Sequence, residues 1–338
     1  MREAIISFPM FGENFQINPP YSLNSLLAQL GKDPVSFDIY FYGIIIGIGF
    51  LLAILYASRV CRRLDMKMDD IYDYVIWAVI AAVICARLYY CITYTDARGV
   101  HTYLKDPASF LRIRDGGLAI YGAVIGAVLA ILVRSRMRKE SAWPAFDIMS
   151  FGLLIGQLVG RWGNFFNREA YGYETDVFCR MGLTLNGVTT WVHPTFLYES
   201  LWNLLGLVLL HFHCKKRRKY QGQYFLAYLI WYGLGRAVIE GLRSDSLWLI
   251  PDVIRISQLL AIVTAVLAAA AWICNARRIA AGKKPLLGRA LDGEDIDGII
   301  DITTDDAAAA APAPAADAED TPADMNEATE KTNHTGGN

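Results

Sequence analysis

IYFYGIIIGIGFLLAILYASR, residues 39–59, reaches its first charged side chain only at its last position, Arg59. A helix needs about 20 consecutive apolar residues to cross a bilayer core about 30 Å thick. Backbone N–H and C=O groups in lipid must bond within their own segment, which a helix achieves and a single strand does not. This stretch therefore predicts a membrane-spanning helix.

Comparable apolar segments recur along the rest of the chain, at residues 72–93, 117–133, 146–165, 196–212, 223–242 and 257–274. Hydrophobic residues make up 54% of the 338-residue chain and charged residues only 19%. Soluble proteins carry about a quarter of their residues as charges. The sequence therefore predicts an all-α integral membrane protein with seven transmembrane helices. The formal net charge of −1 indicates no nucleic-acid partner.

Basic residues predict the orientation of these helices. They follow every second apolar segment, at Arg59, Arg62, Arg63 and Lys67; Arg134, Arg136, Arg138 and Lys139; Lys215, Lys216, Arg217, Arg218 and Lys219; and Arg277, Arg278, Lys283 and Lys284. Such loops face the cytoplasm, so we expect the N-terminus outside and the C-terminus in the cytoplasm. Residues 1–38 then form an extracytoplasmic segment and 39–276 a seven-helix membrane domain. Residues 277–338 form a cytoplasmic basic stretch and a disordered acidic tail rich in Ala and Pro.

Polar residues gather at the end of the fourth predicted helix, in GRWGNFFNREAYG, residues 160–172. An arginine such as Arg161 costs a few kcal/mol to insert into a membrane unless it snorkels or has a partner. One interpretation is an interfacial anchor or a structural ion pair. The close grouping of Arg161 with Asn164, Glu169 and the glycines instead favours a functional polar pocket.

The sixth predicted helix carries a second polar group, in YGLGRAVIEGLR, residues 232–243. Tyr232, Arg236, Glu240 and Arg243 are spaced by four, four and three residues, which places them on one helical face. Glu240 could simply neutralise the two arginines. Alternatively it orients Arg236 so that the planar guanidinium can bind a phosphate. The two interpretations are compatible, because a positioned arginine needs a partner.

A third polar group lies in HPTFLYES, residues 193–200, at the start of the fifth predicted helix. His193 alone would be unremarkable, since single loop histidines are common. Glu199 is inside an otherwise apolar helix and needs a partner there, for which an arginine of the other groups is the natural choice. Tyr42, at the start of the first helix, is interpreted either as an aromatic-belt residue or as part of the site.

Together these segments resemble the prolipoprotein diacylglyceryl transferase family over residues 38–274. The most specific element is GRWGNFFNREAYG, which is similar to the family signature G-R-x-G-N-F-x-N-x-E-x-x-G. The resemblance implies transfer of the diacylglyceryl group of phosphatidylglycerol to the lipobox cysteine of a prolipoprotein. A thioether forms and glycerol phosphate leaves. It also implies a multi-pass protein of the bacterial cytoplasmic (inner) membrane, with no metal and no cofactor.

The resemblance further suggests roles for individual residues. Arg161 and Arg236 would stabilise the negative charge that develops on the departing phosphate. We expect the remaining matched positions to bind substrate, at Asn164, Glu169, Gly172, Tyr42, Tyr232, Glu240, Arg243, His193 and Glu199.

The base that removes the thiol proton stays open. Family members often have a histidine where this chain has Tyr121, in the segment DGGLAIYG, residues 115–122. A tyrosine with a pKa near 10 is a poor base at pH 7. Either Tyr121 only donates a hydrogen bond, or the arginines lower the pKa of the thiol. His193 is a weaker candidate for the base.

Three other functions compete with the transferase. Charged residues within spans also mark transport paths, but the chain has no internal repeat relating two halves. A metal-dependent lipid-phosphate enzyme would need clustered aspartates or histidines on the spans, which the sequence lacks. An intramembrane protease is disfavoured, because neither GxSG nor HExxH occurs.

Overall fold

We analysed a computed structural model of the chain. The structure describes residues 2–12, 14–64, 66–95, 103, 110–111, 116–214, 218–246, 248–250 and 253–291. The greater part of the predicted tail, from residue 292 onward, lies outside the described residues.

Among the residues that the structure describes, seven helices are long and apolar enough to cross a membrane, which confirms the predicted spans. They are α2 (Phe41–Val60), α3 (Met68–Thr93), α5 (Ile120–Arg138), α6 (Trp143–Asn167), α7 (Thr195–Cys214), α8 (Gln223–Ile239) and α9 (Ile256–Ala280). A 3-10 turn, η5 (Glu240–Leu242), extends α8 by three residues. The third predicted span extends further than expected at its basic end, because α5 continues through Arg138.

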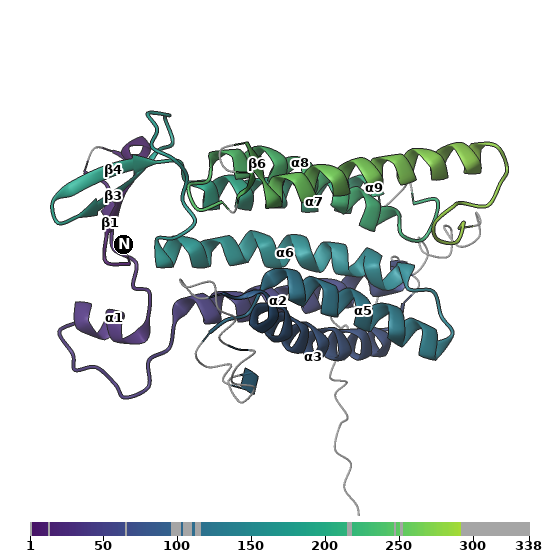
Figure 1. Cartoon of the computed structure of the whole chain (residues 1–338), viewed down its shortest axis with the longest axis horizontal. Helices are drawn as coiled ribbons and strands as arrows, with labels where there is room; N and C mark the ends of the chain where they lie inside the picture. Colours follow the sequence, from purple (N-terminus) through teal and green to yellow (C-terminus); the bar gives the residue numbers. More distant parts are fainter. Residues whose placement is uncertain are drawn as a thin grey trace, which may run out of the picture. The chain divides into compact units, whose positions relative to one another are not determined.

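Helix α6 occupies the middle of the helical part. It packs against α2, α7 and α8, while α3 packs against α5 and α8 against α9. Figure 1 shows α6 between α2, α3 and α5 on one side and α7, α8 and α9 on the other. The described part of α6 is also the most buried of the seven spans. Side chains on α6 are therefore shielded from lipid, which suits the polar signature at its end.

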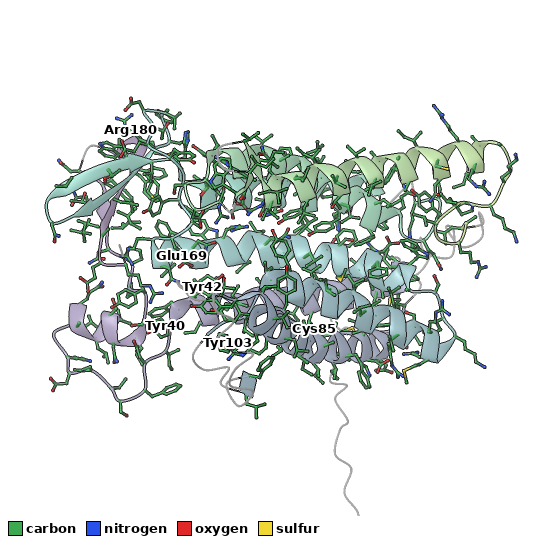
Figure 2. All side chains as sticks on the ribbon, in the orientation of Figure 1. Tyr40, Tyr42, Cys85, Tyr103, Glu169 and Arg180 are labelled. Carbon is green, nitrogen blue, oxygen red and sulfur yellow. The ribbon has the colours of Figure 1, made fainter. Side chains whose placement is uncertain are left out.

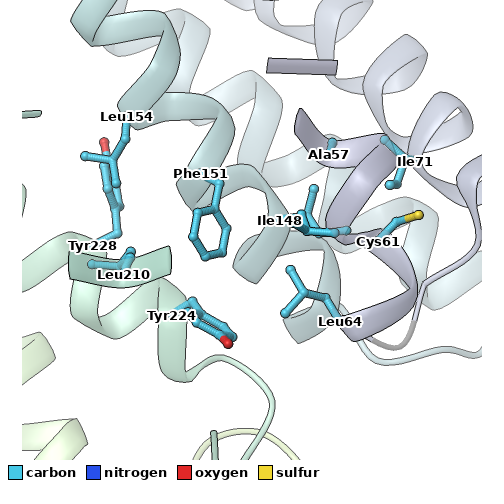
Figure 3. Close-up of a cluster of buried hydrophobic side chains, with 11 residues drawn as sticks. Ala57, Cys61, Leu64, Ile71, Ile148, Phe151, Leu154, Leu210, Tyr224 and Tyr228 are labelled. Carbon is cyan, nitrogen blue, oxygen red and sulfur yellow. The ribbon is translucent and has the colours of Figure 1, made fainter. Parts of the chain in front are cut away.

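An apolar cluster fills the half of this bundle that lies away from the signature end of α6 (Figure 3). Its buried members come from α2, α3, α6, α7, α8 and the turn after α2, and include Ala57, Leu64, Ile71, Ile148, Phe151, Leu154, Leu210, Tyr224 and Tyr228. Asp147 lies beside this cluster and is fully buried. It accepts backbone N–H groups of Gly222 at 2.8 Å and Phe225 at 3.0 Å. The carboxylate thereby caps the start of α8, whose first N–H groups have no partner within the helix.

Helices α7 and α8 are joined by a tryptophan pair. The rings of Trp202 and Trp231 stack with centroids 4.2 Å apart. Each indole N–H donates to the backbone carbonyl of the other residue at 3.0 Å. A Cβ on Gly235 would collide with the Trp202 ring, so only glycine permits this close approach. The pair fixes α8 against α7 near the polar groups that both helices carry.

A small sheet lies beyond the end of α6 and is formed by residues outside the predicted spans. Its four strands are antiparallel in the order β2 (Gln16–Ile17), β1 (Ile5–Ser7), β3 (Met181–Leu185) and β4 (Val188–Val192). Asn186 and Gly187 form the turn between β3 and β4, both with positive φ, as a two-residue hairpin requires. A second pair, β5 (Trp248–Ile250) and β6 (Ile254–Arg255), precedes α9. A short helix, α1 (Leu23–Gln29), follows β2.

Arg168 ties this sheet to α6. It ends the helix in the left-handed conformation, with φ of 49°. Its buried guanidinium donates to the carbonyl of Ala4 at 3.0 Å and to Asn18 Oδ1 at 2.7 Å. The amino-terminal segment is thereby held at the polar end of α6.

Candidate functional site

The site is built around Glu199, a carboxylate that is only 4% exposed. Oε2 of Glu199 pairs with Arg161 of α6, and Oε1 pairs with Arg236 of α8 at 2.9 Å. A guanidinium nitrogen of Arg243 lies 3.7 Å from Oε1. A buried charge is stable only when it is paired and hydrogen-bonded, so these contacts explain how Glu199 is accommodated in α7.

Arg236 is held at both ends of its guanidinium group. One terminal nitrogen contacts Glu199, and the other lies 2.6 Å from Oε2 of Glu240, four residues further along. Glu240 is buried in η5, at the end of the same helix. Two carboxylates from different helices therefore fix the plane of the Arg236 fork.

A hydrogen-bonded chain leads from Arg161 toward the surface. Arg161 donates to Asn164 Oδ1 at 3.2 Å, and Asn164 donates to Glu169 Oε1 at 3.1 Å. Asn167 donates to the same glutamate oxygen at 3.3 Å. Glu169 is exposed just beyond the end of α6, where Figure 2 labels it. The signature motif thus connects a partly buried arginine with an exposed carboxylate.

Tyr42 and Tyr232 border this cluster. Tyr42, labelled in Figure 2, interacts electrostatically with Glu169 and Arg161. Its ring lies against Gly163, where a Cβ would come within 2.6 Å of it, so the signature glycine makes room for the tyrosine. Tyr232 interacts electrostatically with Arg236 and Arg161 and stacks on the neighbouring Tyr228.

Gly172 brings the end of the signature motif to the other polar segments. Its N–H donates to the carbonyl of His193 at 2.9 Å, and it forms a β-bridge with Arg243. A Cβ at Gly172 would lie 2.6 Å from Cβ of His193 and 2.7 Å from the Leu242 carbonyl oxygen. Glycine is therefore required for this backbone approach.

Arg243 also contacts an acidic residue outside the buried cluster. It donates two hydrogen bonds to Asp245, at 2.9 and 2.8 Å. Burial acts to raise the pKa of Asp245, but the bonds from Arg243 outweigh it and hold that pKa below its ordinary value. Asp245 is thus ionised at neutral pH and orients Arg243.

Among the described contacts, His193 and Tyr121 bond to partners outside the arginine cluster. Burial lowers the pKa of His193 below its ordinary value, and Nδ1 of His193 lies 3.3 Å from the Tyr198 hydroxyl. The hydroxyl of Tyr121 lies 3.0 Å from the Ser257 hydroxyl, which links α5 to α9. The described hydrogen bonds of both side chains therefore go to hydroxyl groups rather than to the arginines.

Sequence patterns did not reveal two residues that support the end of α8. Arg255 of β6 donates to the carbonyl of Glu240 and lies over the Trp248 ring, 4.7 Å from its centroid. Gln258 donates to the Ala237 carbonyl at 2.7 Å. In the sequence, Arg255 and Gln258 are only two polar residues at the start of the last apolar span, and this pattern does not identify their partners.

The cluster offers fixed N–H donors and positive charge. A guanidinium group has five N–H donors, and the described contacts to Glu199, Asn164 and Glu240 occupy only some of those on Arg161 and Arg236. Planar, charged donors of this kind suit the oxygens of a phosphate. Within the described ranges, no three metal-ligating side chains come together.

A family model described as prolipoprotein diacylglyceryl transferase matches residues 33–274. A Limosilactobacillus reuteri (strain DSM 20016) protein named phosphatidylglycerol--prolipoprotein diacylglyceryl transferase is 42% identical over 254 residues, 72% of this chain and 87% of the relative. Proteins of the same name from Bacillus cereus (strain 03BB102) and Bacillus anthracis (strain CDC 684 / NRRL 3495) are also 42% identical. Those matches span 250 residues, 71% of this chain and 87% of each relative. The chain therefore belongs to the prolipoprotein diacylglyceryl transferase family.

Proposed function

We propose that this membrane enzyme transfers the diacylglyceryl group of phosphatidylglycerol to a prolipoprotein, a step of bacterial lipoprotein maturation. Family membership supports this activity, and so do the names of its relatives. The observation in the structure that carries the proposal is the pairing of Arg161 and Arg236 on one buried glutamate, Glu199. That arrangement holds two guanidinium groups where a lipid phosphate can bind both.

The acceptor is proposed to be the cysteine thiol of a lipobox peptide. The thiolate attacks the glyceryl carbon that is bonded to the phosphate oxygen. A carbon–sulfur bond forms while the carbon–oxygen bond breaks, and the electron pair of the broken bond leaves with glycerol phosphate. The phosphate gains negative charge in this step, so fixed donors from Arg161 and Arg236 stabilise the transition state more than the bound lipid.

The thiol must lose its proton before it attacks, since the thiolate is the nucleophile. The contacts of Tyr121 favour the route in which the arginines lower the pKa of the thiol. Its hydroxyl bonds to Ser257, whereas the arginines supply the positive charge that lowers the pKa of a nearby thiol. Tyr121 then supports the α5–α9 contact, and solvent or a phosphate oxygen accepts the proton.

We also propose that the basic ends of the helices face the cytoplasm of a bacterial inner membrane. Arg134 and Arg138 at the end of α5 pair with Asp73 and Asp70 at the start of α3. The signature end of α6 then faces outward. Residues 39–276 form the catalytic part, and residues 1–38 belong to the outer side. Residues 277–338 follow on the cytoplasmic side.

The test uses the full-length protein with labelled phosphatidylglycerol and a lipobox peptide, without added metal or nucleotide. We expect a mass increase on the peptide cysteine equal to a diacylglyceryl group, together with released glycerol phosphate. A Cys→Ser peptide should stay unmodified. Folded protein that produces neither product would overturn the proposal.

A further inference from the structure

A second polar layer lies one helical turn deeper than the arginine cluster. Gln157 precedes Arg161 by four residues on α6, and Asn203 follows Glu199 by four residues on α7. Four residues of helix correspond to about 6 Å along its axis. Because α6 and α7 run antiparallel and Arg161 pairs with Glu199, these offsets bring Gln157 and Asn203 to the same depth.

Further contacts place this layer inside the bundle. Ser200 of α7 donates to the Leu158 carbonyl of α6 at 3.0 Å, between the two layers. Gln157 donates from Nε2 to the Tyr228 hydroxyl of α8 at 2.9 Å. Leu154 and the ring of Tyr228 belong to the apolar cluster of Figure 3, which begins directly beneath. The amide layer therefore separates the arginines from the dry core.

Both amides have a buried polar atom without a partner among the described residues. These atoms are Oε1 of Gln157 and Oδ1 of Asn203, and Asn203 as a whole is only 2% exposed. A buried polar group without a hydrogen bond is unfavourable by about 1–3 kcal/mol, so it usually marks the place of a missing partner. Phosphate binding by Arg161 and Arg236 uses neither of these two amides.

A carboxamide can bond to either donors or acceptors by turning end for end. The Tyr228 hydroxyl both donates and accepts, so Gln157 can bond to it in both orientations. In the turned orientation, the NH₂ group of Gln157 points to the place where its oxygen had no partner. The layer can therefore supply N–H donors to a bound acceptor.

We infer that Gln157 and Asn203 bind the ester carbonyl oxygens of the diacylglyceryl group. This inference rests on the proposed function, which places the lipid phosphate on Arg161 and Arg236. In a lipid, the glyceryl esters lie a few ångströms deeper than the phosphate, on the side of the acyl chains. Ester groups have acceptors and no donors, and the amide layer is at the corresponding depth.

The contact makes a prediction about lipid selectivity. The probe is phosphatidylglycerol with two ether-linked alkyl chains, which has the same headgroup, phosphate and reacting carbon but no ester carbonyls. We measure kcat/KM for the diester and diether lipids with wild type, Asn203→Leu and Gln157→Met. In each variant the ratio of kcat/KM for the diester lipid to kcat/KM for the diether lipid should fall roughly fivefold, the effect of one net hydrogen bond. The rate with the diether lipid should stay close to wild type.

Ser150→Ala is the matched control, because Ser150 is also a buried polar residue of α6. Among the described contacts, its hydroxyl bonds only within its own helix, to the Phe146 carbonyl. It should keep the wild-type selectivity. The electronic difference between the lipids is the same for every variant, so only a change in the ratio reports the contact.

An unchanged ratio in both amide variants would overturn the inference. A raised KM for the lipobox peptide with the lipid ratio unchanged would also overturn it and would assign the amides to the peptide backbone. If the wild-type protein transferred from neither the diester nor the diether lipid, that result would instead contradict the proposed function itself.

Discussion

Arg236 Nη1 lies 2.9 Å from Oε1 of Glu199, joining α8 to α7 inside the membrane-spanning part of the chain. The second oxygen of Glu199 pairs with Arg161 of α6. One carboxylate therefore sets the spacing between two guanidinium groups from different helices. In the proposed function Glu199 is therefore a positioning residue, which acts on the lipid phosphate through the arginines.

Replacing Glu199 with Gln should lower both stability and turnover. The substitution leaves two partly buried arginines without their shared counter-charge, and breaking a buried pair costs about 3–5 kcal/mol. Thermal unfolding in detergent and peptide-transfer rates measure the two effects. Glu174→Gln is the control, since Glu174 is exposed and lies outside the membrane-spanning helices. A Glu199→Gln protein as stable and active as wild type would contradict this role.

Replacing Arg161 or Arg236 with Ala should lower kcat by roughly 100- to 1000-fold, the usual effect of removing one donor to a developing anion. Lysine at either position keeps the charge but loses the planar fork, so we expect partial activity. Circular dichroism and thermal unfolding check that each variant is folded. Near-normal kcat in both alanine variants would show that the phosphate binds elsewhere.

The helical part of the fold could be predicted from local sequence, because each span is a continuous apolar segment. The spacing of Arg236, Glu240 and Arg243 likewise predicted that they share one helical face. The need of Glu199 for an arginine partner also followed from its position in an apolar helix. The structure identifies Arg161 and Arg236 as those partners.

The four-stranded sheet could not be predicted in the same way. Its strands are two to five residues long, and β1 pairs with β3, whose residues are separated from it by most of the membrane domain. Hydrophobic periodicity carries no information on such distant pairs. The Asn186–Gly187 turn was the one local signal for a hairpin. The contact between Tyr121 and Ser257 depends on the packing of α5 near α9 and has no local signal either.

Tyr121→Phe should retain most activity. The variant loses the hydroxyl that bonds to Ser257, so turnover should stay within about fivefold of wild type, as expected for one net hydrogen bond. Ser257→Ala removes the same bond from the other side and should behave alike. A loss of turnover far larger in Tyr121→Phe than in Ser257→Ala would instead indicate that the phenol takes part in proton transfer.

Gly172→Ala adds only one methyl group but should lower both thermal stability and kcat. The new Cβ would lie 2.6 Å from His193 Cβ and 2.7 Å from the Leu242 carbonyl, so the backbone near Arg243 must shift. Overpacking of this kind costs about 1–3 kcal/mol. We expect lower thermal stability and lower kcat. Gly47→Ala is the matched control, because a Cβ on Gly47 meets nothing within 4 Å. Equal stability and activity of the two variants would contradict the predicted clash.

His193 should make stability depend on pH in the mildly acidic range. Burial lowers the pKa of His193 in the folded protein, whereas in the unfolded chain the imidazole titrates near its ordinary value of about 6.5. As pH falls through that value, the unfolded chain takes up the proton first. The unfolded state then binds more protons than the folded state, so stability decreases as the solution becomes more acidic. Above pH 7.5 the imidazole is largely neutral in both states and contributes no pH dependence.

His193→Gln removes this titration. Thermal unfolding between pH 8 and pH 5.5 should therefore show a smaller loss of Tm in the variant than in wild type, with a constant difference above pH 7.5. Asp245 has a lowered pKa and also loses stabilisation as pH falls, but it is present in both proteins, so its effect cancels in the comparison. Parallel curves over the whole range would show that the folded protein accepts a proton on His193 as readily as the unfolded chain.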